Sequence, residues 1–230
     1  PGLGGILPSQ SDYFQAVKGG GHGDYRCLVL APSTVQEAAD LMQLAFDKAD
    51  EYRNPVLLLG DGLIGKMMEP VEFKRTNSPA DLPAKPWATT GFKGREPNII
   101  NSLYLAPEAL EEHNLHLLRK YAHMVENEQR WETFNLDGEV DVLFVAYGSV
   151  ARIAKTAVDL LKEKGIKAGV FRPISLYPYP GDALVEAVKK AKHVLVSELS
   201  TGQMLEDVKY HARHIRDIHF YGRVGGMIMT

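Results

Sequence analysis

The first 25 residues contain the residue types of a ligand-binding loop. Two glycine-rich clusters, Gly2–Gly5 and Gly19–Gly23, flank a polar and aromatic insert that runs from Ser9 to Gln15. Because glycine lacks a Cβ, its backbone adopts positive φ easily and allows a ligand to approach closely. Glycine also disfavours the interiors of helices and strands, so we expect a shaped loop here.

The alternative interpretation of this stretch is a frayed terminus or a cloning remnant, which is also often rich in glycine. Its apolar residues argue for order, because a disordered linker usually lacks them. The spacing of Tyr13, Phe14 and Val17 suits one short helical turn. We therefore expect an ordered loop.

The composition is that of a globular protein, with 45% hydrophobic and 24% charged residues in a chain of 230. A formal charge of -3 gives no broad positive field, so nucleic-acid binding has no electrostatic support. No apolar run approaches the roughly 20 residues of a membrane span, and we expect no secretory leader. We expect a cytoplasmic protein that binds no membrane.

The single cysteine, Cys27, excludes an internal disulfide bond. It also excludes an iron–sulfur cluster held by this chain, because such clusters generally take four thiolates. Any electron transfer then requires a partner chain. Cys27 itself is expected to be a small buried hydrophobic residue.

The first half of the chain predicts a strand, a helix and a second strand. Arg26–Ala31 and Val56–Gly60 are short apolar runs, and a helical pattern lies between them. Thr34 and Glu37 have the spacing of a capping box at the start of that helix. Continuous apolar strands joined by a helix indicate a parallel sheet covered on both faces. Because two strands are too few, either partner strands come from elsewhere in the chain or this is the last part of a larger α/β domain.

The buried face of the helix is predicted from its helical periodicity. The residues on that face are Val35, Ala38, Ala39, Met42, Ala45, Phe46 and Ala49.

A proline-rich connection follows, from about Gly65 to Pro107. Proline removes a backbone donor and restricts the residue before it, so we expect a long irregular linker on the surface. Pro107 suits the first position of a helix, whose apolar stripe points toward Trp131. The histidines along that helix lack the carboxylate pattern of a metal site, and no metal site is expected in this chain.

From Asp141 to Thr230, strand and helix patterns alternate in the manner of a doubly wound α/β unit. Gly148-Ser149 and Gly202-Gln203 follow strands, where helix N-termini suit anions, but neither resembles a phosphate-binding loop. Asp207, His211 and His214 share a helix face, and we interpret them as solvated surface rather than a metal site.

Gly60-Asp61-Gly62 requires separate consideration, because Gly-Asp-Gly opens the magnesium and diphosphate site of thiamine-dependent enzymes. The Asn pair that follows in those enzymes is missing here. We therefore interpret the tripeptide as a turn at the end of a strand.

Several of these motifs together resemble the α subunit of 2-oxoacid:ferredoxin oxidoreductases, especially the branched-chain 2-oxoisovalerate type. The motifs of the first half are Pro1–Gly5, Pro8–Tyr13, Gly20–Asp24, Ala31–Ser33 and Tyr52–Pro55. Those of the remainder are Met67–Pro70, Arg172–Pro173 and Tyr221–Gly226. The similarity covers nearly the whole chain, and the opening loop is its most specific part.

The resemblance implies oxidative decarboxylation of a 2-oxoacid to an acyl-CoA, with thiamine diphosphate as cofactor and ferredoxin as electron acceptor. Magnesium, the diphosphate and the iron–sulfur clusters would belong mainly to partner subunits of a heteromer. The glutamate that activates the cofactor and the arginine that meets the substrate carboxylate would precede Pro1, so no catalytic residue is assigned. The isolated chain is expected to be inactive.

The resemblance also implies a division into three parts. Residues 1–65 would be the C-terminal part of a pyrimidine-type thiamine-binding domain whose N-terminal part is missing. Residues 66–134 would be the linker and its helix, and residues 135–230 a transketolase C-terminal-like domain. The fold class is therefore α/β.

Within this framework, the chain would supply one wall of the site through its opening loop. Backbone at Gly2, Gly4 and Gly5 would lie close to cofactor or substrate. Ser9, Gln10 and Asp12 would support that loop as polar residues behind it. A rival interpretation is a non-catalytic assembly module that binds partner subunits.

Overall fold

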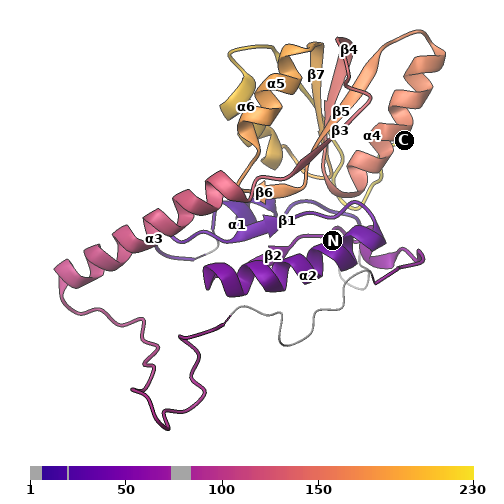
Figure 1. Ribbon diagram of the computed structural model, residues 1–230. Coiled ribbons are helices and arrows are strands. Elements are labelled where there is room, and N and C mark those ends of the chain that lie inside the picture. The colour runs from indigo at the N-terminus through magenta and orange to yellow at the C-terminus, as the bar shows by residue number, and fades with distance from the viewer. Residues whose placement is uncertain (1–6, 20, 74–83) are drawn as a thin grey trace.

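The computed structural model describes residues 7–19, 21–73 and 84–230. Two α/β units lie one above the other, and helix α3 (Pro107–Asn127) extends away from them (Figure 1). The segment before α3, which includes residues 84–106, forms an extended arm on the same side (Figure 1). The expected α/β fold class is confirmed.

The first unit is a three-stranded sheet with strand order β2-β1-β6. Strand β1 (Leu28–Leu30) pairs in parallel with β2 (Val56–Leu58), as the sequence predicts. Its other neighbour is β6 (Ser175–Tyr177), which runs antiparallel and comes from far along the chain. One strand partner of β1 is therefore supplied from elsewhere in the chain. The first unit also contains α1 (Tyr13–Val17), α2 (Val35–Tyr52) and the 3-10 helix η1 (Ile64–Lys66).

Helix α2 begins as the capping pattern predicts, because the backbone N–H of Glu37 donates to Oγ1 of Thr34 at 3.0 Å. Its predicted buried face is partly wrong. Ala45 is buried, but Met42 and Phe46 are 45% and 70% exposed. The residues that pack onto the sheet include Leu41, on a stripe rotated from the predicted one. Periodicity identifies an apolar stripe but does not decide which stripe meets the sheet.

The linker has the irregular structure that its prolines predict. The described residues 67–73 and 84–106 contain no helix or strand. Pro107 is the first residue of α3, which buries Tyr121 and Met124 against the body. The chain then enters a strand rather than extending the helix to Trp131, because β3 spans Trp131–Phe134.

The second unit is a five-stranded sheet of order β3-β5-β4-β7-β8. Its strands are β3, β4 (Val140–Val145), β5 (Ala168–Pro173), β7 (Ala191–Glu198) and β8 (Ile218–Gly222). All neighbours pair in parallel except β3 with β5. Helix α4 (Gly148–Glu163) covers one face, and α5 (Gly181–Lys189) and α6 (Gln203–Ala212) cover the other (Figure 1). This is the doubly wound unit that the alternation predicts.

Candidate functional site

The opening segment, residues 7–18, lies across the carboxyl ends of β4 and β7. Gln10 makes the central contacts and is only 5% exposed. Its side-chain amide donates from Nε2 to the carbonyl oxygen of Tyr147 at 3.0 Å. Its Oε1 accepts from the N–H of Leu199 at 2.8 Å, and its own N–H donates to the Leu199 carbonyl at 2.9 Å. Tyr147 follows β4 and Leu199 follows β7, so Gln10 joins the ends of both strands.

Tyr147 packs beneath this segment. Its hydroxyl donates to the carbonyl oxygen of Gln10 at 3.3 Å, and its ring lies 5.8 Å from that of Tyr13. Burial, together with the nearby Glu198, Asp61 and Asp12 carboxylates, raises the pKa of Tyr147 well above its ordinary value. The hydroxyl therefore remains protonated and serves as a hydrogen-bond donor.

Gly148 must be glycine at this junction. Its φ is +58°, and a Cβ would lie 3.0 Å from both Oδ2 of Asp61 and Nε2 of Gln10. A side chain at this position would therefore strain the backbone, and it would also crowd two polar neighbours. This glycine allows the opening segment and the Asp61 turn to approach the start of α4.

Asp61 caps α4 from the first unit. Its Oδ2 accepts from the N–H of Ser149 at 3.1 Å. Its Oδ1 accepts from the N–H groups of Leu63 and Ile64, at 3.0 and 3.2 Å, within its own turn. A carboxylate at a helix N-terminus stabilises the exposed N–H groups and the dipole. Gly60-Asp61-Gly62 is thus a turn at the end of a strand, as the missing Asn pair indicates.

A small cavity of about 20 Å³ lies inside this junction, between Ser9, Asp12, Asp61 and Gly148. Its volume is that of about one water molecule. The structure therefore brings Ser9, Gln10 and Asp12 together, but Gln10 points toward the second unit. Gly2, Gly4 and Gly5 lie outside the described residues, so their predicted role stays a prediction.

The next turn of the segment, α1, docks on α6. Tyr13 donates through its hydroxyl to Oδ2 of Asp207 at 2.5 Å, and Lys18 forms an ion pair with the other oxygen. Asp207 is buried, so its interpretation as solvated surface is wrong. His211 is half-buried and stacks on Tyr179, with ring centroids 5.7 Å apart. The spacing of residues along α6 could not predict that Asp207 is buried, because α1, which is distant in the sequence, covers this face of α6.

An ion-pair network on another side joins α2 to the second sheet. Arg172 of β5 is 3% exposed and donates two hydrogen bonds to the Glu37 carboxylate. Its Nε lies 3.0 Å from Oε2 of Glu132. Burial alone would raise the pKa of Glu37, but the hydrogen bonds from Arg172 and Ser33 outweigh it and lower the pKa below its ordinary value.

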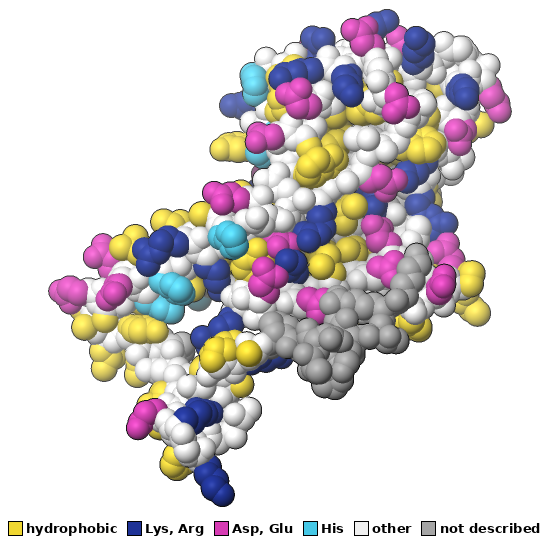
Figure 2. Space-filling model, in the orientation of Figure 1, with side chains coloured by type: hydrophobic (Ala, Val, Ile, Leu, Met, Phe, Trp, Pro, Cys, Tyr) yellow, Lys and Arg dark blue, Asp and Glu magenta, His cyan; other side chains and the backbone are white. Residues whose placement is uncertain are grey.

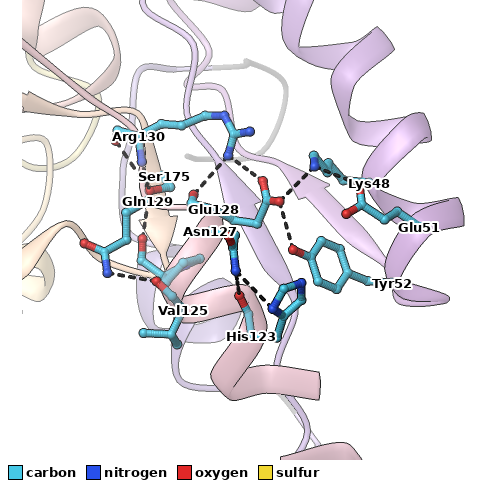
Figure 3. A network of polar contacts seen from close by, with 11 residues as sticks. Lys48, Glu51, Tyr52, His123, Val125, Asn127, Glu128, Gln129, Arg130 and Ser175 are labelled. Atoms are coloured by element: carbon cyan, nitrogen blue, oxygen red, sulfur yellow. Dashed lines mark hydrogen bonds and ion pairs between the residues drawn. The ribbon is translucent and has the colours of Figure 1, made fainter. Parts of the chain in front are cut away.

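A second network fixes the end of the linker helix (Figure 3). The buried Glu128, at the end of α3, accepts from the Tyr52 hydroxyl at 2.9 Å and pairs with Lys48 at 2.8 Å. Arg130 donates to its other oxygen at 2.6 Å, and the N–H of Arg130 donates to Oγ of Ser175. The linker therefore returns to the body at a fixed position between α2 and β6.

Surface charge in the view of Figure 2 is mixed, with acidic and basic side chains side by side over both units. Among the described residues, no cluster of three or more His, Cys, Asp or Glu side chains is placed to bind a metal ion. Within the same residues, no helix has the length and hydropathy needed to cross a membrane.

Sequence reasoning did not identify Tyr147 and Leu199 as residues that receive the opening segment, and it placed Asp61 only in a turn at the end of a strand. A weak signal was present, because Gly148-Ser149, next to Tyr147, follows a predicted strand, and the carboxyl ends of such strands commonly bind ligands. This signal did not indicate that the chain's own opening segment lies at these strand ends.

Two family models match the chain in succession. Residues 3–133 match the model described as pyruvate flavodoxin/ferredoxin oxidoreductase, thiamine diP-bdg. Residues 140–230 match pyruvate:ferredoxin oxidoreductase core domain II.

Curated relatives are similar over nearly all of the chain. Ketoisovalerate oxidoreductase subunit VorB of Methanothermobacter marburgensis is 43% identical over 229 residues, covering 100% of this chain and 64% of that protein. The 2-oxoglutarate synthase subunit KorA of Methanocaldococcus jannaschii is 32% identical over 242 residues, covering 96% of this chain and 65% of that protein. The chain thus spans about two thirds of the length of these relatives.

Among the solved structures with a similar fold is 2-oxoglutarate:ferredoxin oxidoreductase from Magnetococcus marinus, with 2-oxoglutarate, coenzyme A and succinyl-CoA bound. The match has a TM-score of 0.74 at 22% identity and covers 98% of this chain and 44% of that one.

Proposed function

The chain belongs to the pyruvate flavodoxin/ferredoxin oxidoreductase family, and from this membership we propose that it is the α subunit of a branched-chain 2-oxoacid:ferredoxin oxidoreductase. The observation that carries the substrate class is the 43% identity to a ketoisovalerate oxidoreductase subunit, against 32% to a 2-oxoglutarate synthase subunit.

The proposed reaction is oxidative decarboxylation of the 2-oxoacid. The bond between the carboxylate and the oxo carbon breaks and releases carbon dioxide. The remaining acyl group forms a thioester with coenzyme A, whose thiol loses its proton. Two electrons leave the acyl carbon for ferredoxin, and iron–sulfur clusters held by partner subunits would supply the path. Thiamine diphosphate, when bound, stabilises the carbanion formed on decarboxylation.

The chain itself would contribute the wall formed by its opening loop. Asp61 already accepts three backbone N–H groups, so this turn does not fit a magnesium and diphosphate site. This supports the proposal that magnesium and the diphosphate are held mainly by partner subunits. The single cysteine of the chain supports the same proposal for the iron–sulfur clusters. Ser9, Gln10 and Asp12 would be the polar supports of the loop at Gly2, Gly4 and Gly5.

We also retain the division into residues 1–65, 66–134 and 135–230, and a cytoplasmic heteromer, as parts of this proposal. The arm of residues 84–106 supports contact with other subunits, because Ile99 and Leu105 are 81% and 84% exposed. The same observation favours the second candidate function, a non-catalytic assembly module.

The test is an assay of the complex assembled with its partner subunits, thiamine diphosphate, magnesium and coenzyme A. We expect 2-oxoacid-dependent reduction of a viologen dye, with kcat/KM for 2-oxoisovalerate at least about tenfold above that for 2-oxoglutarate, a difference of about 1.4 kcal/mol. The matched control is the same mixture without this chain, which should be inactive. Full activity without the chain would contradict both candidate functions. Loss of assembly, rather than loss of activity in an assembled complex, when the opening loop is altered would support the assembly module instead. A loaded, assembled complex that oxidises no 2-oxoacid would contradict the proposal.

A further inference from the structure

The second unit has a topological switch point at the carboxyl ends of β4 and β7, and we call the space outside these strand ends the crevice. Strand β4 leads into α4 on one face of the sheet, and the neighbouring β7 leads into α6 on the other face (Figure 1). Open α/β sheets bind ligands at such a switch point, outside the strand ends. The chain's own residues occupy this place.

Both helix N-termini beside the crevice already have anionic caps. Asp61 accepts from the N–H of Ser149 at the start of α4. Glu198 accepts from the N–H groups of Met204 and Leu205 at the start of α6, each at 3.1 Å. An external anion would therefore meet two carboxylates rather than free N–H groups.

Gln10 fills the space between these two caps. Its side-chain amide donates to the end of β4 and accepts from the end of β7, and its backbone N–H adds a third hydrogen bond. The side-chain hydrogen bonds join Gln10 to Tyr147, which lies 137 positions away in the sequence, and to Leu199, which lies 189 positions away. The second unit thus holds the opening segment where another doubly wound unit would hold a ligand.

We propose that the second unit binds residues 7–18 as an internal ligand, and that Gln10 is the positioning residue that holds this segment, with Ser9 and Asp12, against the ends of β4 and β7. This inference rests on the proposed function, in which Ser9 and Asp12 support the wall that the chain contributes to the 2-oxoacid site. Gln10 does not touch the substrate in this account, because its side chain is buried against the second unit.

Removing the Gln10 side-chain amide would shift the equilibrium between the docked and the undocked opening segment. Without its two side-chain hydrogen bonds, the segment leaves the crevice more often, and the binding-competent fraction falls. Apparent substrate affinity falls by the same factor, whereas saturating substrate restores the competent form. A positioning role therefore raises KM and leaves kcat nearly unchanged.

The experiment compares Gln10→Ala and Gln10→Met with the unaltered protein in the assembled, cofactor-loaded complex. Gln10→Met fills similar space without either side-chain hydrogen bond, so it carries the test if Gln10→Ala does not assemble. The matched control is Gln15→Ala, because Gln15 is exposed on α1 and makes no hydrogen bond with the described residues. KM and kcat for 2-oxoisovalerate are measured, together with amide hydrogen exchange of residues 7–18.

We expect about a tenfold rise in KM, kcat within about twofold, and faster exchange in residues 7–18, with the control unchanged. An unchanged KM, a loss of kcat alone, or unchanged exchange would overturn the inference. If the unaltered complex oxidises no 2-oxoacid, the proposed function fails and hydrogen exchange alone decides. Faster exchange confined to residues 7–18 would then still support docking in the crevice, and unchanged exchange would refute it.

Discussion

Arg172 of β5 and Glu37 of α2 form a bidentate ion pair across the two units, with Nη2 2.6 Å from Oε1 and Nη1 2.7 Å from Oε2. Ser33 also donates to the Glu37 carboxylate, from its N–H at 2.7 Å and its hydroxyl at 3.0 Å. Glu37 therefore links the start of its own helix to the second sheet.

The first prediction concerns the strength of this link. Glu37→Gln removes a charge that faces the buried Arg172 and leaves Glu132 as its one anionic partner among the described residues. We expect a loss of about 2–3 kcal/mol in the free energy of unfolding, because an unbalanced buried charge is costly. Urea unfolding of the chain measures it. The matched control is Glu186→Gln, which breaks an exposed pair with Lys189 and should change stability by less than about 0.5 kcal/mol. Equal effects in both variants would contradict this role.

The second prediction is the pH dependence of stability that this pair causes. The pKa of Glu37 is lowered in the folded chain, so its contribution is present above the unfolded pKa of about 4.3 and is lost as pH falls through the folded value. The stability difference between the unaltered chain and Glu37→Gln should therefore shrink below about pH 4.3. Urea midpoints at pH 7, 5 and 3.5 measure this difference. A difference that stays constant with pH would show that the Glu37 charge is not the cause.

The third prediction tests the approach of the opening segment to α4. Gly148→Ala places a Cβ at positive φ and 3.0 Å from Asp61 and Gln10, so we expect a loss of about 2–4 kcal/mol in unfolding free energy. Gly165→Ala is the control, because its φ of +74° is also positive but nothing lies within 4 Å of the added Cβ. The control should show only the backbone cost of about 1 kcal/mol. Thermal or urea unfolding compares the two, and equal losses would rule out a steric conflict at Gly148.

The fourth prediction separates two roles of Asp61. As the cap of α4, Asp61→Ala should cost about 1–2 kcal/mol in unfolding free energy and speed hydrogen exchange at the Ser149 amide. The thiamine diphosphate and magnesium concentrations that half-saturate the complex should stay unchanged. The control is Asp159→Ala, because Asp159 is exposed on α4. A large rise in the magnesium requirement would instead identify Asp61 as part of the cofactor site.

The local elements of this protein follow from patterns of neighbouring residues in its sequence. Thr34 and Glu37 specify the start of α2, apolar runs specify the strands, and prolines specify the linker without regular structure in its described part. These features depend on neighbouring residues, whose spacing directly reflects backbone geometry. The glycine-rich opening and the family motifs also predict the position of the candidate site.

Only the tertiary structure decided which surfaces meet. It assigned β6 to the first sheet, exposed Phe46 and buried Asp207 beneath α1. It also placed the Gln10 side chain against the ends of β4 and β7. These contacts join residues more than a hundred positions apart, and periodicity carries no information about such pairings. Topology and close packing therefore determine which apolar stripe is covered and which polar group finds its partner.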